Sequence, residues 1–477
     1  MVSWANSGSR DLHLNLREAI RPGARGAKDL LLGALREAVR SGQLATGTVL
    51  PPSRQLAADL GLARNTVSEA YADLVAEGWL ASRQGAGTWV VNTRDVKSPS
   101  RLRGPPSQPT HNLMPDSPDV SAFPRTAWLA SARRALMGAP NEALRHGDPR
   151  GRPELREALA EYLGRARGVR TSPDNVVICA GTRNAVELLA RAFADRGPIA
   201  VEGYGLFLFR DAIAAMGVDT IPIGFDEQGA KVDELDGLDA SAALLTPAHF
   251  FPHGVPLHAA RRTAVIDWAR RTGRYVLEDD YDGEFRYDRQ PVGAVQGLDP
   301  QRVAYLGSAS KSLSPALRLG WMALPDDLVE PVIAAAGGEQ FYVNAIDQLT
   351  MADFIAVGQY DKHIRRMRIA YRRRRDELVR RLTEFDVSIS GLSAGLHLLL
   401  LLPEGTEHTV LRRAGEAGIA LSGLALLRHP LAGRDVPEAD GLVVNFGGPA
   451  THAFGAAVDA LCGVLEASGL TRPNDQR

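Results

Sequence analysis

Apolar residues recur at helical spacing in the first part of the chain and then give way to two strand-like runs. The helical stretches are separated by glycines, Gly42 after the first and Gly61 after the second. The strand-like runs, 79–82 and 88–91, flank a glycine-containing connection. We therefore predict three helices, at about 27–39, 54–60 and 63–77, followed by a β-hairpin.

The later part of the chain shows a second pattern. Helical stretches alternate with short apolar runs at 176–179, 199–201, 242–245, 275–277 and 303–306. Such runs between helices are typical of buried parallel strands. This pattern predicts an α/β fold, a mostly parallel sheet wrapped by helices.

A Pro- and Ser-rich stretch separates the two patterns. Residues 92–124 lack helical periodicity, which predicts an extended, largely unstructured tether. We place a first domain at 12–92, a linker at 93–111 and a second domain at 112–470. Within the second domain, we expect a large subdomain at about 135–345 and a small C-terminal subdomain at about 350–470.

Composition limits the class of protein. The chain has 477 residues and is 45% hydrophobic, which allows a large core and more than one domain. Its two cysteines, Cys179 and Cys462, lie far apart without metal-ligand spacing, so they fit inert core thiols in a reducing compartment. The sequence lacks an apolar signal core and a membrane-length run. We expect a soluble, cytoplasmic protein that binds no metal.

Charge gives little information about the first domain, but the position of its polar residues gives more. Residues 1–95 carry 11 Lys/Arg and 9 Asp/Glu, which is weak support for a nucleic-acid partner. Two short helices around a glycine turn, with polar residues at the start of the second, are what reading a DNA major groove requires. The alternative for any single residue is a solvated helix face. These helices and the hairpin resemble the winged helix of the GntR transcription factors, and by that resemblance the candidate contacts are Arg54, Arg64, Asn65, Thr66 and Ser68 on the helices and Gln84 and Gly85 at the tip of the hairpin.

Lys311 carries the most informative chemistry of the second domain. It follows the apolar run 303–306 in a turn rich in hydroxyls, which is how a lysine that forms a Schiff base is presented. Pyridoxal 5'-phosphate needs such an amine, together with donors for its phosphate and a carboxylate for its ring nitrogen. Asp279 would pair with the ring nitrogen, and Tyr281 would donate to the ring oxygen beside the Schiff base. A surface loop around Lys311 and a solvated acidic turn at 278–280 are the alternatives.

The phosphate of this cofactor would lie among hydroxyls, amides and one arginine. Gly181 and Thr182 follow the run 176–179 and lead into a helix, whose N-terminus is suited to an anion. Ser308, Ser310 and Arg318 lie in the Lys311 turn, and Arg318 offers a fixed fork of donors. His249 follows the run 242–245. Because the carboxyl ends of parallel strands meet at one edge of a sheet, these residues should converge on one ligand.

The first domain resembles the winged helix of the GntR transcription factors over roughly 26–91, and the whole chain resembles the MocR/GabR subfamily of these regulators. The residues that carry the second resemblance are Pro115-Asp116, Phe123-Pro124, Trp128, 147–151, Leu155-Arg156, 246–249, 278–282, Ser310-Lys311, Pro315, Leu317-Arg318 and 395–397. The resemblance implies a winged helix joined to a fold-type I aminotransferase-like domain. It also implies a vitamin B6-dependent regulator of transcription that forms a head-to-tail homodimer.

Several positions depart from this family around the expected ligand. An ungapped alignment puts Leu206 where a ring-stacking tyrosine is common, so Tyr204 is the candidate for stacking. The segment 442–447 lacks the arginine that clamps a substrate carboxylate in aminotransferases. Arg210, Arg261 or Arg428 could compensate, although a helix surface or a carboxylate partner is the simpler role for each. The other departures are Phe250 for a glutamine, Ala309 for an aromatic residue and His146 for a tyrosine that reaches the neighbouring subunit's phosphate.

Three functions are therefore open. The leading hypothesis is a regulator that binds a DNA operator with two half-sites, its binding modulated by pyridoxal phosphate or by a small-molecule effector reacting there. The regulated genes would serve vitamin B6 or amino-compound metabolism. The second hypothesis is an active aminotransferase with a DNA-binding appendage, and in the leading one only a residual half-reaction remains. In the third, the large domain binds no cofactor and serves only for dimerisation.

Overall fold

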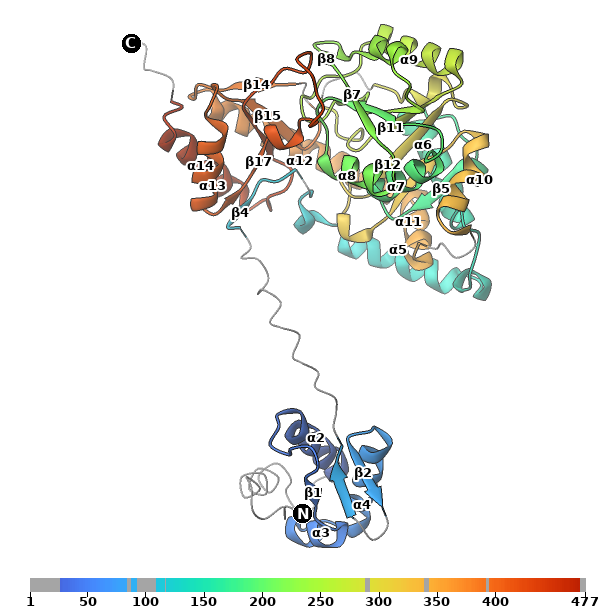
Figure 1. The fold of residues 1–477 in the computed structure, drawn as a ribbon, viewed down its shortest axis with the longest axis vertical. Coiled ribbons are helices and arrows are strands. Elements are labelled where there is room, and N and C mark those ends of the chain that lie inside the picture. Colours follow the sequence, from blue (N-terminus) through green and yellow to red (C-terminus); the bar gives the residue numbers. More distant parts are fainter. Residues whose placement is uncertain are drawn as a thin grey trace. The chain divides into compact units, whose positions relative to one another are not determined.

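The computed structural model describes residues 26–83, 87–91, 109–115, 117–287, 292–338, 343–391 and 394–471. The chain divides into two compact units, Met1–Gln108 and Pro109–Arg477, and the division falls inside the expected linker (Figure 1). Among the described residues, no helix is both long and apolar enough to cross a membrane.

The first unit is a three-helix bundle with a small sheet. Its helices are α2 (Ala27–Arg40), α3 (Ser53–Leu60) and α4 (Arg64–Ala76), close to the predicted ranges. Gly61 ends α3 with φ at 67°, a left-handed conformation that favours glycine. Strands β1 (Val49–Leu50), β2 (Leu80–Arg83) and β3 (Gly87–Val90) pair antiparallel in the order β1-β3-β2. The short β1 was not predicted. It adds a third strand to the expected hairpin.

The second unit is built on a seven-stranded sheet with the order β5-β13-β12-β11-β10-β6-β7. Six strands run in one direction, and β13 is antiparallel to both of its neighbours. The predicted runs became β5, β6, β10, β11 and β12, whereas β7 and β13 were missed. The bounds are β5 Val176–Cys179, β6 Ile199–Glu202, β7 Thr220–Ile223, β10 Ala242–Leu245, β11 Tyr275–Asp279, β12 Val303–Ser308 and β13 Gly320–Ala323.

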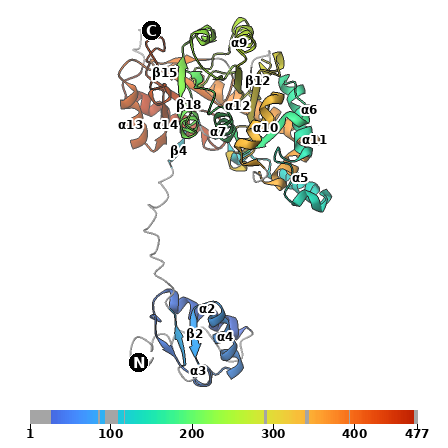
Figure 2. The ribbon, with the colours of Figure 1, turned by 45° about the vertical axis from the view of Figure 1, so that its right-hand side comes forward.

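Helices cover this sheet, and a second sheet forms a separate lobe of the same unit (Figures 1 and 2). The helices with the large sheet are α5 Arg125–Gly138, α6 Pro153–Arg167, α7 Thr182–Ala192, α8 Phe207–Ala215, α9 Ala259–Thr272, α10 Asp326–Ala335 and α11 Ala345–Ala356. The second lobe has strands in the order β14-β15-β18-β17, all antiparallel. Its elements are β14 Ser388–Ser390, β15 His397–Leu401, β17 Ser422–Gly423, β18 Gly441–Asn445, α13 Glu407–Glu416 and α14 Phe454–Ala467.

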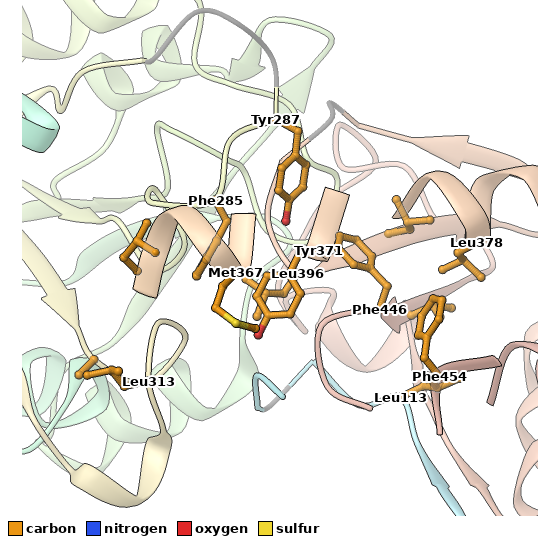
Figure 3. Packing of buried hydrophobic residues seen from close by; sticks show 14 of the residues in the cluster. Leu113, Phe285, Tyr287, Leu313, Met367, Tyr371, Leu378, Leu396, Phe446 and Phe454 are labelled. Atoms are coloured by element: carbon orange, nitrogen blue, oxygen red, sulfur yellow. The ribbon is translucent and has the colours of Figure 1, made fainter. Parts of the chain in front are cut away.

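The long helix α12 (Gln359–Leu382) joins the two lobes through its buried face. Met367, Tyr371 and Leu378 of this face belong to one hydrophobic cluster with residues from both sheets (Figure 3). The Tyr371 ring meets the Phe285 ring edge to face, with centroids 5.3 Å apart. Because this core is continuous, the two lobes form one packed body.

The predicted tether is too long at its C-terminal end. Strand β4 (His111–Asn112) pairs in parallel with β16 (Ile419–Ala420) of the second lobe. Asp119 is buried and accepts a hydrogen bond from Arg374 of α12 at 2.7 Å. The interpretation of 111–124 as tether was therefore wrong, since backbone pairing and a buried ion pair hold this segment to the second unit.

Candidate functional site

The carboxyl ends of the parallel strands surround a cavity of about 240 Å³. Because β5, β6, β10, β11 and β12 point the same way, the residues at or after their ends meet at one edge of the sheet. The lining residues supplied by these strand ends are Gly181, Thr182, Glu202, Thr246, Asp279, Tyr281, Ser308, Ser310 and Lys311. The structure thus brings together the residues that the sequence placed at separate strand ends.

Lys311 reaches this cavity from the turn after β12. Its Nζ donates a hydrogen bond to the carbonyl oxygen of Pro115 at 2.7 Å. Gly307 of β12 leaves room for the Trp321 side chain of the neighbouring β13, because a Cβ there would lie 2.4 Å from Nε1 of Trp321. Lys311 is half-buried at the cavity wall, and its amine lies beside the segment that enters the unit from residue 109.

Asp279 ends β11 and is buried, with 4% of its surface exposed. Its Oδ1 has no hydrogen-bond partner in the part of the chain that the structure describes. Burial raises the pKa of Asp279 well above the usual range of a carboxyl group, and the nearby Asp280 and Asp282 raise it further. A buried carboxyl oxygen without a donor fits a ligand that brings a positively charged N–H, such as a pyridinium ring.

Tyr281 lies against His249, and the two form a short chain with Asp282. His249 Nδ1 lies 2.8 Å from Asp282 Oδ2 and 2.9 Å from the Tyr281 hydroxyl. When His249 Nδ1 carries a proton and donates it to Asp282, the Tyr281 hydroxyl does not donate to His249, and its own proton can be donated to another acceptor. Burial raises the pKa of Tyr281 well above its usual range, so the hydroxyl remains a donor at neutral pH.

The residues predicted for a phosphate all line the same cavity. They are Gly181, Thr182, Ser308, Ser310 and Arg318. Gly181 has φ at 98° and precedes α7, whose first amides are available to an anion. Gly320 on β13 allows this turn to approach, because a Cβ on Gly320 would lie 2.7 Å from the Gly181 Cα. Two glycines, Gly181 after β5 and Gly320 in the neighbouring β13, thus allow this turn to adopt its conformation.

Sequence reasoning gave no role to two buried polar residues of the cavity, Glu202 and His397, although His397 lies in the motif 395–397. Glu202 ends β6 and accepts hydrogen bonds from the Thr246 amide at 3.1 Å and the Thr246 hydroxyl at 2.5 Å. Burial raises the pKa of Glu202 to about 8. Burial, together with the nearby His249 and Lys311, lowers the pKa of His397 well below its ordinary value. The position of Glu202 at a strand end was a usable signal.

His397 has a ring nitrogen, Nε2, that is buried and lacks a hydrogen-bond partner within the described residues. Its ring lies 5.4 Å from the His249 ring and 6.3 Å from the Tyr281 ring. Since a low pKa keeps the imidazole neutral, His397 can donate or accept one hydrogen bond in the cavity.

Tyr204 is fully buried and borders the cavity, but its hydroxyl is directed to the second lobe. Its hydroxyl donates to the Pro437 carbonyl at 2.9 Å, and its ring meets Phe225 and His253 edge to face. The stacking role of Tyr204 stays a prediction. Leu206 also lines the cavity.

Of the three arginines considered as replacements for a carboxylate clamp, Arg210 lines the cavity. Its guanidinium donates to the carbonyls of Gly205, Leu426 and Leu427 at 3.5, 3.4 and 2.9 Å, and no carboxylate of the described residues lies within ion-pair distance. Arg261 instead pairs with Asp226 at 2.6 Å. Arg428 donates to the carbonyls of Ala432, Gly433 and Val436. Of the three, only Arg210 is therefore placed at the cavity and left without a carboxylate among the described residues.

The remaining departures lie elsewhere. Phe250 is buried against Phe225 and His253, and Ala309 is buried in the core that includes Leu313. His146 lines a second hollow with Gly147, Asp148 and Arg152, apart from the cavity of Lys311.

In the first unit, the candidate DNA contacts lie on the surface where α3 meets α4. Arg54, Arg64 and Asn65 are exposed, and Thr66 and Ser68 are half-buried at the start of α4. Val67, Ala70 and Tyr71 of the same helix are buried, which directs the polar side chains outward. The predicted contacts Gln84 and Gly85 lie outside the described residues.

Comparisons with known proteins cover both units. A model of bacterial regulatory proteins of the gntR family matches residues 30–90, and one of aminotransferase class I and II matches residues 117–427. The chain is 34% identical over 403 residues to the HTH-type transcriptional regulator YhdI of Bacillus subtilis, covering 81% of this chain and 85% of YhdI. It is 32% identical over 419 residues to the probable rhizopine catabolism regulatory protein MocR of Rhizobium meliloti, covering 82% and 85%. It is 31% identical over 397 residues to the pyridoxine biosynthesis regulator PdxR of Corynebacterium glutamicum, covering 81% and 86%.

The chain belongs to the MocR subfamily of GntR transcription regulators. The fold agrees, because the kynurenine aminotransferase of Pyrococcus horikoshii is similar with a TM-score of 0.66 and 25% identity. That comparison covers 75% of this chain and 90% of the enzyme. The predicted fold class, a winged helix-turn-helix with a fold-type I aminotransferase-like domain, is confirmed. In this MocR-type regulator, the aminotransferase-like unit carries the cavity described above.

Glu202 gives a prediction for the pH dependence of stability in this MocR-type chain. Its folded pKa of about 8 exceeds the ordinary 4.5, so its contribution to the free energy of unfolding is full below pH 4.5 and is lost as the pH rises to about 8. Between these two pH values the loss is about 1.4 kcal/mol per pH unit for one group. Glu202→Gln keeps the acceptor for Thr246 and should remove this slope, measured as the free energy of urea unfolding across the window. Glu416→Gln, on an exposed helix face, should behave as the wild type, and equal slopes in all three proteins would contradict the assignment.

Proposed function

We propose that this regulator binds pyridoxal 5'-phosphate at Lys311, and that the cofactor, or an effector reacting with it, modulates operator binding. The observation that carries the proposal is the buried, partnerless oxygen of Asp279 in one cavity with the Lys311 amine. Each feature alone has a structural explanation, but together they match the two ends of one heteroaromatic aldehyde.

Different residues of the cavity would bind different parts of the cofactor. Lys311 would supply the amine that bonds to the aldehyde carbon, and Asp279 would keep the ring nitrogen protonated. The Tyr281 hydroxyl would donate to the ring oxygen, while the turn at Gly181 and Thr182, with Ser308, Ser310 and Arg318, would hold the phosphate. When bound, the cofactor supplies an electrophilic carbon and an electron-withdrawing ring.

Modulation of DNA binding is supported by the position of the segment that leads from the first unit. Pro115 and Ser117 line the cavity, and Asn445 of β18 donates to the Met114 and Ser117 carbonyls at 2.8 Å each. A covalent bond formed at the Lys311 amine would therefore form beside Pro115, in the segment that leads back toward the winged helix. Coupling of this kind requires that the ligand favour one arrangement of the chain.

An effector with an anionic group would suit the cavity. Arg210 lies among apolar side chains of the same wall, Leu206, Phe209 and Ile213. A second buried polar group, His397, offers one hydrogen bond. The relatives PdxR and MocR carry names that refer to pyridoxine biosynthesis and rhizopine catabolism, which supports genes of vitamin B6 or amino-compound metabolism as targets.

A second candidate function is aminotransferase turnover, favoured by the presence of Lys311, Asp279 and Tyr281 in one cavity. The sequence of β18 carries no arginine to clamp a substrate carboxylate, and Asn445 of that strand is used for backbone carbonyls. We therefore place regulation first and assign at most a half-reaction to the cavity.

We also propose a homodimer, because apolar side chains are exposed along one helix. Leu129 and Met137 of α5 are 67% and 81% exposed, and Leu144 just beyond the helix is 54% exposed. Exposed apolar groups gathered in this way mark an interface. A dimer carries two winged helices and so reads two half-sites.

The dimer proposal predicts that Leu129→Asp with Met137→Asp yields monomers. Light scattering should give about twice the 51.3 kDa chain mass for the wild type and the single mass for the variant. The control is Leu431→Asp, because Leu431 is 73% exposed but lies in the second lobe. A variant of dimeric mass would contradict this interface.

For the cofactor, we expect borohydride reduction after incubation with pyridoxal phosphate to fix the cofactor on the peptide that contains Lys311. Lys311→Ala should lose both this label and the visible absorption, because no other lysine lines the described cavity. Lys231→Ala should keep both. Labelling of Lys311→Ala at the wild-type level would show that another amine is used.

For the regulator, the decisive experiment selects genomic fragments bound by the chain with and without pyridoxal phosphate. Asn65→Ala should weaken binding to the selected operator by about 5- to 150-fold, which corresponds to about 1–3 kcal/mol for a lost base contact. Gln43→Ala, an exposed change between α2 and β1, should bind as the wild type. A chain that selects no defined fragment, or whose selection ignores the cofactor in wild type and Lys311→Ala alike, would contradict the proposal.

A further inference from the structure

Helix α12 has an unusual charge for an element of the hydrophobic core. Of its 24 residues, 10 are Lys or Arg and 3 are Asp or Glu. The chain as a whole has a formal net charge of −1, so this excess is local. Like charges at helical spacing repel one another, and the sequence tolerates this cost along several turns.

The basic residues that are exposed lie on one face of α12, apart from Arg368, which donates to the Glu284 carbonyl. They recur three or four residues apart, opposite the buried face with Met367, Tyr371 and Leu378 (Figure 3). We call this face the α12 stripe, and it comprises Lys362, Arg365, Arg366, Arg372, Arg373 and Arg380, with Ile369 and Asp376 among them. Its length follows from the helix rise, about 27 Å from Lys362 to Arg380.

The central charges of the stripe are not neutralised within the chain. Lys362, Arg365 and Arg373 form no ion pair with any other residue that the structure describes. Arg372 has one carboxylate, Asp376, at 4.0 Å. Elsewhere on the same unit, exposed arginines such as Arg271 and Arg412 have acidic partners. A polyanion would therefore find unused donors on this face.

We propose that the α12 stripe binds the sugar-phosphate backbone of the duplex that the winged helix reads. The inference rests on the DNA binding of the proposed function. Guanidinium groups bind phosphates through two parallel hydrogen bonds. In the proposed function, the first unit of the same chain binds a DNA duplex. The 17 residues between 91 and 109 span at most about 60 Å, which keeps a duplex bound by the first unit within reach of the second. The stripe matches about eight base pairs in length, given about 3.4 Å per step.

The test measures how the affinity of the full-length chain for DNA depends on salt. The probe is a fluorescein-labelled duplex that carries the selected operator and extends well beyond it on both sides. Arg365→Glu with Arg373→Glu should lower affinity at least about tenfold and reduce the slope of log affinity against log salt by about 2, since each phosphate contact contributes about 0.9. Arg271→Glu with Arg412→Glu changes the net charge equally and should leave the slope unchanged.

Arg365→Gln with Arg373→Gln provides a milder pair that keeps the helix face polar. It should reduce the slope by the same amount with a smaller loss of affinity, because it removes attraction without adding repulsion. A short duplex limited to the operator should show smaller effects for both pairs.

The outcomes separate the inference from the function on which it rests. If the wild type binds no operator, the proposed function fails. If the wild type binds but both stripe pairs keep its slope, or the control pair loses as much, the stripe has no role in DNA binding. A stripe variant that becomes monomeric in light scattering would assign the face to a second copy, and binding of an acidic protein without any change in DNA affinity would assign it to that partner.

Discussion

The chemistry of this protein depends on a carboxyl group that the chain buries without satisfying. The acids around Asp279 all have donors from the protein. Glu278 accepts the amides of Val295 and Gln296, and Asp280 accepts Arg167 and Tyr305. Leaving one buried oxygen unpaired is costly, so its persistence at the end of β11 indicates a ligand that completes it.

The sheet makes this arrangement possible, and much of it could be predicted from sequence. Short apolar runs marked five of the seven strands, and parallel direction then required their ends to meet at one edge. Asp279, Tyr281 and Lys311 were found because each follows such a run. Strand β13 was missed because no α-helix separates it from β12, so the alternation of helical stretches and apolar runs did not mark it.

Other parts of the site depend on contacts between residues far apart in the chain. His397 comes from the second lobe, and its nearness to His249 could not be predicted from spacing. The choice among three candidate arginines also needed coordinates, because only these show that Arg261 already has a carboxylate partner. Likewise, the end of the tether could not be placed, since the parallel pairing of β4 with β16 joins segments about 300 residues apart.

The hydrogen bond between Lys311 and Pro115 sets up a competition. The Lys311 nitrogen can donate to the Pro115 carbonyl or form a covalent bond to a ligand, and it cannot do both in the same geometry. Under the proposed function, a covalent bond at Lys311 would take this donor away from the Pro115 carbonyl. The state of the cavity would then reach the segment that begins at residue 109 through a single exchange of hydrogen-bond partners, with no change required in the sheet.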